Sequence, residues 1–186
     1  MAKPAKPIVP GYSVTLTGTH RGHEGEPCAS GKLKRDGKVV ALVDDDDHGG
    51  PLRFEWLDRA GLKENITIER FDGSEVTYPV SHEEALLVAH CKALPPLPNE
   101  YGGGPLRQDP DLFVGLLMEE EQYRKDMRRG LAKKTMFVED GEIYEIRALG
   151  PDVSARLKQR HPKSVILNDL PEVEALAIWI RTAKGH

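Results

Sequence analysis

The chain is poor in the features that mark secreted, membrane-spanning and disulfide-stabilised proteins. Its 186 residues include two cysteines, Cys28 and Cys91, which are far apart and form no Cys-x-x-Cys pair. No apolar run approaches the roughly 18 residues that a membrane-spanning helix needs, and the first residues lack the apolar segment of a signal peptide. We therefore predict a cytoplasmic protein with two reduced thiols and no membrane contact.

An excess of positive charge is also absent. The chain has 26 Lys and Arg against 30 Asp and Glu, a net charge of −4. This balance argues against a general nucleic-acid scaffold, which would be basic, although it permits a local basic patch. The shares of apolar residues (39%) and charged residues (30%) fit a folded protein with a well-charged surface.

Nucleophile and phosphate-binding motifs are missing as well. There is no Gly-x-Ser-x-Gly elbow, and neither cysteine has the local sequence of a catalytic thiol. Gly49 and Gly50 are not followed by the Lys-Ser/Thr of a phosphate loop, so we expect them to form a tight turn. We predict no cofactor.

What is present is a series of strand patterns followed by helix patterns. Alternating or apolar runs around Asp-Gly turns predict four or five antiparallel strands in the first 80 residues. Ser81 and Glu84 form a capping-box pattern that begins a helix extending to Ala93. The predicted fold class is α+β, with an N-terminal antiparallel sheet and one helix, then a long amphipathic helix and a ββαβα half.

Proline and glycine content suggests how these elements are divided. Asp109 and Pro110 supply a capping carboxylate and a first-turn proline for the long helix, which we expect to continue to about Lys133. The predicted regions are a flexible tail (1–10), a β-rich domain with a helix (11–94), a Pro/Gly linker (95–108) and an α+β C-terminal half (109–186).

An acidic run follows the apolar residues 39–43 and is the first candidate site. The run consists of Asp44, Asp45, Asp46, Asp47 and His48. Adjacent like charges repel and Asp is rare in strands, so we expect the chain to leave its sheet here. Several carboxylates suit Ca²⁺ or Mg²⁺, but the closing Glu of an EF-hand loop is missing. A solvated acidic loop is the favoured interpretation, and a structural or catalytic cation remains an alternative.

A basic row on the long helix is the second candidate site. Arg124 and Arg128 are four residues apart, as are Lys125 and Arg129, so they form two neighbouring rows on the helix surface. These rows could contact nucleic-acid phosphates. They could instead form ion pairs with the preceding glutamates of the same helix, and we favour this interpretation.

Four segments (29–50, 131–137, 157–162 and 165–169) together resemble a group of small uncharacterised proteins of bacteria and their phages. Those proteins combine two strands around an Asp-Gly-Lys turn with an Asn-Asp-Gly-x-Gly-Gly ending. This chain departs from the pattern because Asp45 or Asp46 replaces a glycine and an extra helix follows Leu170. The resemblance implies a mobile-element context in a bacterial host cell and carries no activity. Phage accessory proteins of this size are often antagonists of host defence, and we therefore expect an anti-defence protein of the anti-CRISPR type.

From these patterns we predict a non-catalytic accessory protein that binds and inhibits a bacterial immune component. Its expected partner is a host protein or a ribonucleoprotein complex. The predicted contact residues are Asp44, Asp45, Asp46, Asp47, His48, Arg124, Lys125, Arg128 and Arg129. The alternatives are a metal-dependent enzyme acting on nucleic acid or nucleotide through residues 44–48, and a nucleic-acid-binding regulatory module using the basic helix 124–134.

Overall fold

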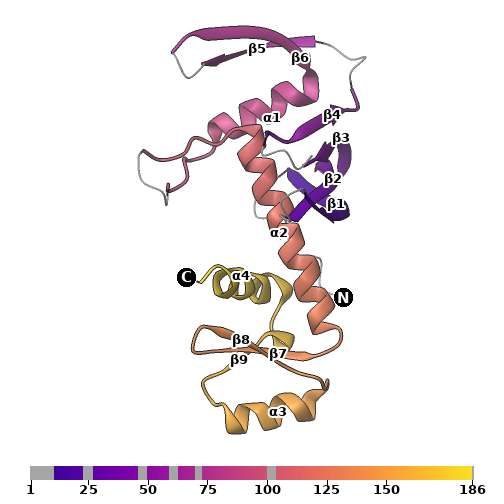
Figure 1. Cartoon of the computed structure of the whole chain (residues 1–186), viewed down its shortest axis with the longest axis vertical. Coiled ribbons are helices and arrows are strands. Elements are labelled where there is room, and N and C mark those ends of the chain that lie inside the picture. Colours follow the sequence, from indigo (N-terminus) through magenta and orange to yellow (C-terminus); the bar gives the residue numbers. More distant parts are fainter. Residues whose placement is uncertain are drawn as a thin grey trace. The chain divides into compact units, whose positions relative to one another are not determined.

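A computed structural model describes residues 11–22, 27–45, 50–58, 63–69, 73–99 and 104–185. These residues form nine strands and four α-helices, which confirms the predicted α+β class (Figure 1). They group into two compact units that divide between Met118 and Glu119. We call these the N-terminal unit and the C-terminal unit.

The N-terminal unit begins with a four-stranded antiparallel meander. Its strands, in spatial order, are β1 (Tyr12–Arg21), β2 (Pro27–Arg35), β3 (Lys38–Asp44) and β4 (Arg53–Trp56). Asp36 and Gly37 both have positive φ (52° and 83°), as the predicted Asp-Gly turn between β2 and β3 requires. The four-residue strand β4 was not predicted, because a run this short carries little periodic signal.

Two helices cover one face of this sheet. They are α1 (His82–Ala93) and the first part of α2 (Pro110–Leu131). Leu33 and Ala41 are fully buried on the sheet side of the core, and Leu87 and Val114 are fully buried on the helix side. Cys91 joins the same core, as predicted, and its burial raises the pKa of the thiol to about 12. The core therefore lies between the meander and the helices.

A separate two-stranded hairpin lies against α1 (Figure 1). Its strands are β5 (Lys63–Glu69) and β6 (Glu75–Ser81), so the described part of the N-terminal unit has six strands rather than four or five. Ile66 and Val80 pack against Ala85 and Val88 of the helix. The Ser81 hydroxyl accepts a hydrogen bond of 3.2 Å from the Glu84 amide, which confirms the predicted cap.

The C-terminal unit has a three-stranded sheet with a helix on each face (Figure 1). Its elements are β7 (Thr135–Glu139), β8 (Glu142–Ile146), α3 (Pro151–Arg160), β9 (Val165–Ile166), a 3₁₀ turn η1 (Leu167–Asp169) and α4 (Glu172–Ala183), with sheet order β8-β7-β9. Phe137 packs with Leu157 of α3 on one face. Met136, the preceding residue on β7, packs with Met127 and Leu176 on the other face.

Asn168 joins three backbone segments of the C-terminal unit. Its side-chain oxygen accepts from the Met136 amide (2.7 Å), and its side-chain nitrogen donates to the Leu131 carbonyl (3.2 Å) and the Lys134 carbonyl (3.0 Å). This one amide therefore satisfies backbone groups at the end of α2 and the start of β7.

The division between the units lies inside α2 and not in the predicted linker 95–108. Phe113 and Met118, from the first part of α2, belong to the N-terminal core, whereas Met127 belongs to the C-terminal core. Within the predicted linker, Leu97 and Leu106 pair through two backbone hydrogen bonds of 2.9 Å. No helix in the described residues is both long and apolar enough to cross a membrane.

Candidate functional site

The acidic run begins on hydrogen-bonded backbone at the end of β3. Asp44 is the last residue of that strand, which extends one position into the acidic run, and its carboxylate accepts a hydrogen bond of 2.5 Å from the Ser30 hydroxyl. The Asp45 amide still donates to the Ala29 carbonyl of β2 at 3.1 Å. The other three predicted residues, Asp46, Asp47 and His48, lie outside the described residues.

An open groove lies beside this point on the sheet face that the helices leave uncovered. Its volume is about 620 Å³. The lining residues come from all four strands and include Thr17, Lys32, Leu42, Asp44, Arg53 and Glu55. In the sheet register Ser30 lies opposite Asp44, and Asp44 lies opposite Arg53. Asp44 therefore contributes to the floor of the groove as well as to the acidic turn.

The basic row of α2 lies in the C-terminal unit and contacts carboxylates of the same unit. Arg124 forms ion pairs with Glu120 (2.5 Å), Glu121 (3.3 Å) and Glu172 (3.2 Å). Arg128 also pairs with Glu172, at 2.7 Å.

The other two predicted members of this row are Lys125, which is half-buried, and Arg129. Arg129 approaches Asp126 at 3.5 Å, and its side chain is 70% exposed. Arg124 thus forms the ion pairs with the preceding glutamates that the sequence favoured, whereas Arg128 and Arg129 pair with other carboxylates of the C-terminal unit.

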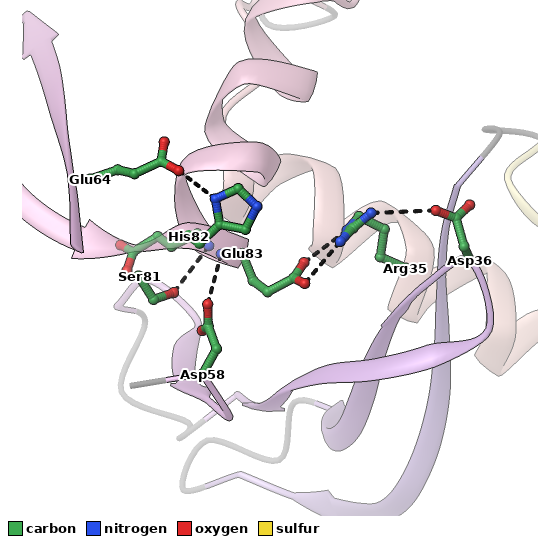
Figure 2. Close-up of polar contacts among 8 residues, drawn as sticks. Arg35, Asp36, Asp58, Glu64, Ser81, His82 and Glu83 are labelled. Carbon is green, nitrogen blue, oxygen red and sulfur yellow. Dashed lines mark hydrogen bonds and ion pairs between the residues drawn. The ribbon is translucent and has the colours of Figure 1, made fainter. Parts of the chain in front are cut away.

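Figure 2 shows a polar cluster at the start of α1 that the sequence patterns did not predict. The Arg35 guanidinium donates two hydrogen bonds to the Glu83 carboxylate, at 2.8 and 2.9 Å. Asp58 accepts from the Glu83 amide at 3.0 Å. On the neighbouring hairpin, Glu64 contacts the His82 ring. The cluster connects β2, the end of β4 and the β5–β6 hairpin to one end of α1.

The charged groups of this cluster hold the start of α1 in place. The Glu83 side chain is 11% exposed, and its hydrogen bonds from Arg35 lower the pKa of the carboxyl below its usual value. The same contact raises the pKa of Arg35. Both groups therefore stay ionised and bound to each other, so neither is poised to exchange a proton with a substrate.

The predicted contact residues belong to two different units. Asp44 ends β3 and Asp45 follows it in the N-terminal unit, and the four basic residues lie on α2 in the C-terminal unit. Among the described residues, no group of three or more His, Cys, Asp or Glu side chains is arranged to hold a metal ion. The sequence alone did not reveal the groove, because its lining depends on the pairing of four strands.

Comparison of the chain with protein-family models, with curated protein sequences and with solved structures finds no match.

Proposed function

We propose that the chain is a non-catalytic accessory protein of a phage or other mobile element. It binds and inhibits a bacterial immune component, as anti-CRISPR proteins do. The observation that carries this proposal is the anchored start of the acidic turn beside the open groove. The Asp44 carboxylate accepts a hydrogen bond from Ser30, and the Asp45 amide donates to β2, so the first carboxylate of the turn and the backbone that follows it have defined positions.

Preorganised negative charge suits a basic partner surface of the kind that normally holds nucleic acid. Residues 1–118 carry 18 Asp and Glu against 13 Lys and Arg, whereas residues 119–186 carry 12 against 13. The negative charge of the chain is thus concentrated in the half that contains the acidic turn. Long-range attraction from this half would speed encounter with a basic partner and would weaken with added salt.

The nucleic-acid-binding alternative has weaker support. The cations that would contact phosphates include Arg124 and Arg128, and both already pair with carboxylates of the C-terminal unit. Binding a nucleic-acid phosphate would require those pairs to break or to be shared. We therefore assign direct contact with the partner to the acidic turn rather than to α2.

The proposal is tested by phage plating on a host with active CRISPR immunity. Expression of the chain is expected to raise the plating efficiency of a targeted phage, and the variant Asp44→Lys, Asp45→Lys is expected to lose this effect. The matched control is Arg128→Glu, Arg129→Glu, which changes charge in the C-terminal unit and is expected to retain the effect. The proposal fails if expression of the wild-type chain leaves the plating efficiency of the targeted phage unchanged on hosts with each type of CRISPR immunity. It also fails if the control variant alone loses the effect.

A further inference from the structure

The outer face of the four-stranded sheet carries a row of side chains that the sheet register places side by side. Thr15 pairs with Lys32, Lys32 with Leu42, and Leu42 with Glu55. Neighbouring residues along each strand point inward, and Leu33, Ala41 and Trp56 are buried beneath the sheet. The row therefore crosses all four strands on the face opposite the core.

Leu42 lies at the centre of this row between opposite charges. It is 39% exposed, so the row presents one apolar side chain between two charged ones. Lys32 lies on one side of it and Glu55 on the other, and neither charged side chain has a hydrogen-bond or ion-pair partner among the described residues. All three line the groove of about 620 Å³.

We infer that this groove binds an extended segment of the partner protein, with an apolar side chain over Leu42, an acidic side chain toward Lys32 and a basic side chain toward Glu55. This inference rests on the proposed function, because it names a second contact on the same binding protein. An apolar centre with charges around it is the usual composition of a protein-binding surface.

Charge complementarity selects a polypeptide over a nucleic acid. The groove is lined by two cations, Lys32 and Arg53, and by two anions, Asp44 and Glu55. A polyanion would gain from the cations but would be repelled by the anions, so the lining offers it no net attraction. A polypeptide can present both signs. Lys32 and Glu55 are two strand spacings apart, about 9.6 Å, and same-side residues four positions apart in an extended chain span about 13 Å. Flexible side chains cover the difference, so the expected segment has the pattern acidic-x-apolar-x-basic.

The inference is tested by selecting a displayed library of random dodecapeptides on the full-length chain. Enriched peptides are expected to carry acidic, apolar and basic side chains at alternate positions, all in a single order along the peptide. Their affinity is expected to fall about tenfold or more in Leu42→Asp, because a charge then replaces the apolar contact. Circular dichroism checks that this outward-facing substitution leaves the fold intact.

An exchange variant, Lys32→Glu with Glu55→Lys, provides the sharper control. It preserves net charge and exchanges the positions of the basic and the acidic side chain. Peptides selected on this variant should therefore carry their acidic and basic residues in the reverse order along the chain. A nuclear magnetic resonance titration with one enriched peptide should shift the amides of residues 30–32, 42–44 and 53–55. The inference is overturned if no peptide is enriched, if peptides bind Leu42→Asp equally well, if the exchange leaves their pattern unchanged, or if a thymidine oligonucleotide competes for the groove.

The two proposals can fail separately. Loss of plating activity in the Asp44→Lys, Asp45→Lys variant tests the acidic turn in a host with CRISPR immunity, whereas the peptide selection needs no host component. If the exchange variant reverses the peptide pattern but the wild-type chain has no effect on plating, the groove is supported and the immune partner is rejected. Plating activity that is unaffected by Leu42→Asp, together with failed peptide selection, would keep the proposed function and reject the groove.

Discussion

Two sets of charged side chains, one in each unit, differ in how they are engaged within the fold. In the C-terminal unit, Arg124, Arg128 and Lys158 each contact a carboxylate of their own unit. In the N-terminal unit, the part-buried pair of Arg35 with Glu83 holds α1, while Lys32 and Glu55 on the sheet face have no side-chain partner among the described residues. The difference teaches that the number of charges does not identify a contact surface. What matters is whether a charge is already paired with an opposite charge within the fold.

The largest expected effect on an ion pair separates the part-buried pair from the surface pairs. Glu83→Ala should lower the free energy of unfolding by about 3 kcal/mol, because it removes both charge-assisted hydrogen bonds of the Arg35 guanidinium. Glu172→Ala should cost less than about 1 kcal/mol, although Glu172 contacts both Arg124 and Arg128. Urea unfolding measures both values.

The two tryptophans make this measurement specific to each unit, because Trp56 lies in β4 and Trp179 lies in α4. Trp179→Phe leaves Trp56 as the reporter of the N-terminal unit, and Trp56→Phe leaves Trp179 for the C-terminal unit. Equal destabilisation by Glu83→Ala and Glu172→Ala would contradict the distinction between part-buried and surface pairing.

A second prediction concerns the C-terminal unit, where a neutral side chain is expected to matter more than any ion pair. Asn168→Ala should destabilise the unit by about 2 kcal/mol, because three backbone groups lose their partner. Asn168→Asp is the matched variant: it retains an acceptor for the Met136 amide but turns a carboxylate toward two carbonyls. It should be at least as destabilising. If Asn168→Ala costs no more than Glu172→Ala, the ranking is wrong.

As pH falls, the free energy of unfolding should begin to decline at a higher pH for the N-terminal unit than for the C-terminal unit. Hydrogen bonds from Arg35 lower the pKa of Glu83 from its usual 4.5, so the carboxylate stabilises the fold at higher pH and this contribution declines as pH falls from about 4.5 through the folded-state pKa. A hydrogen bond from Lys158 lowers the pKa of Asp169 in the same direction, but both side chains are more than a third exposed.

Urea unfolding as a function of pH, followed separately through each tryptophan, measures this difference. Glu83→Gln should flatten the acid limb of the Trp56 signal and leave that of Trp179 unchanged. A Trp56 profile that keeps its wild-type slope in Glu83→Gln would show that other groups control the acid transition.

The smallest effect is expected on the outer sheet face. The exchange of Lys32→Glu with Glu55→Lys should change stability by no more than about 0.5 kcal/mol, because neither side chain contacts a partner among the described residues. Leu33→Ala, one residue along β2, is the positive control: Leu33 is fully buried, so this change should cost about 2–5 kcal/mol. A large loss in the exchange variant would mean that the two charges serve the fold.

Local chemistry allowed most of the secondary structure to be predicted. Asp140 and Gly141 have positive φ (51° and 81°), as an Asp-Gly hairpin turn requires, and α1 and α2 begin where their capping residues indicate. Each of these signals lies within a few neighbouring residues. The same locality explains the missed strand β4, whose four residues have meaning only beside β3.

Contacts between distant residues could not be predicted in this way. Arg35 and Glu83 are separated by 48 positions, and no spacing rule connects a hairpin residue with a residue in the first turn of a helix. The division between the two compact units inside α2 also has no local signal, because prolines and glycines at 95–108 mark irregular backbone but do not show where a core ends. The groove depends on four strands in register and carries no contiguous motif.

The outer face of the sheet also bears on how such a protein changes over generations. Substitutions at Lys32, Leu42 or Glu55 would alter what the proposed groove recognises, while the buried residues beneath them keep the strands together. If the groove binds as proposed, recognition and folding are encoded in alternate residues of the same strands. A lineage can explore new partners at one set of positions without risking the loss of its structure at the other, which is an advantage to any protein whose target is itself evolving.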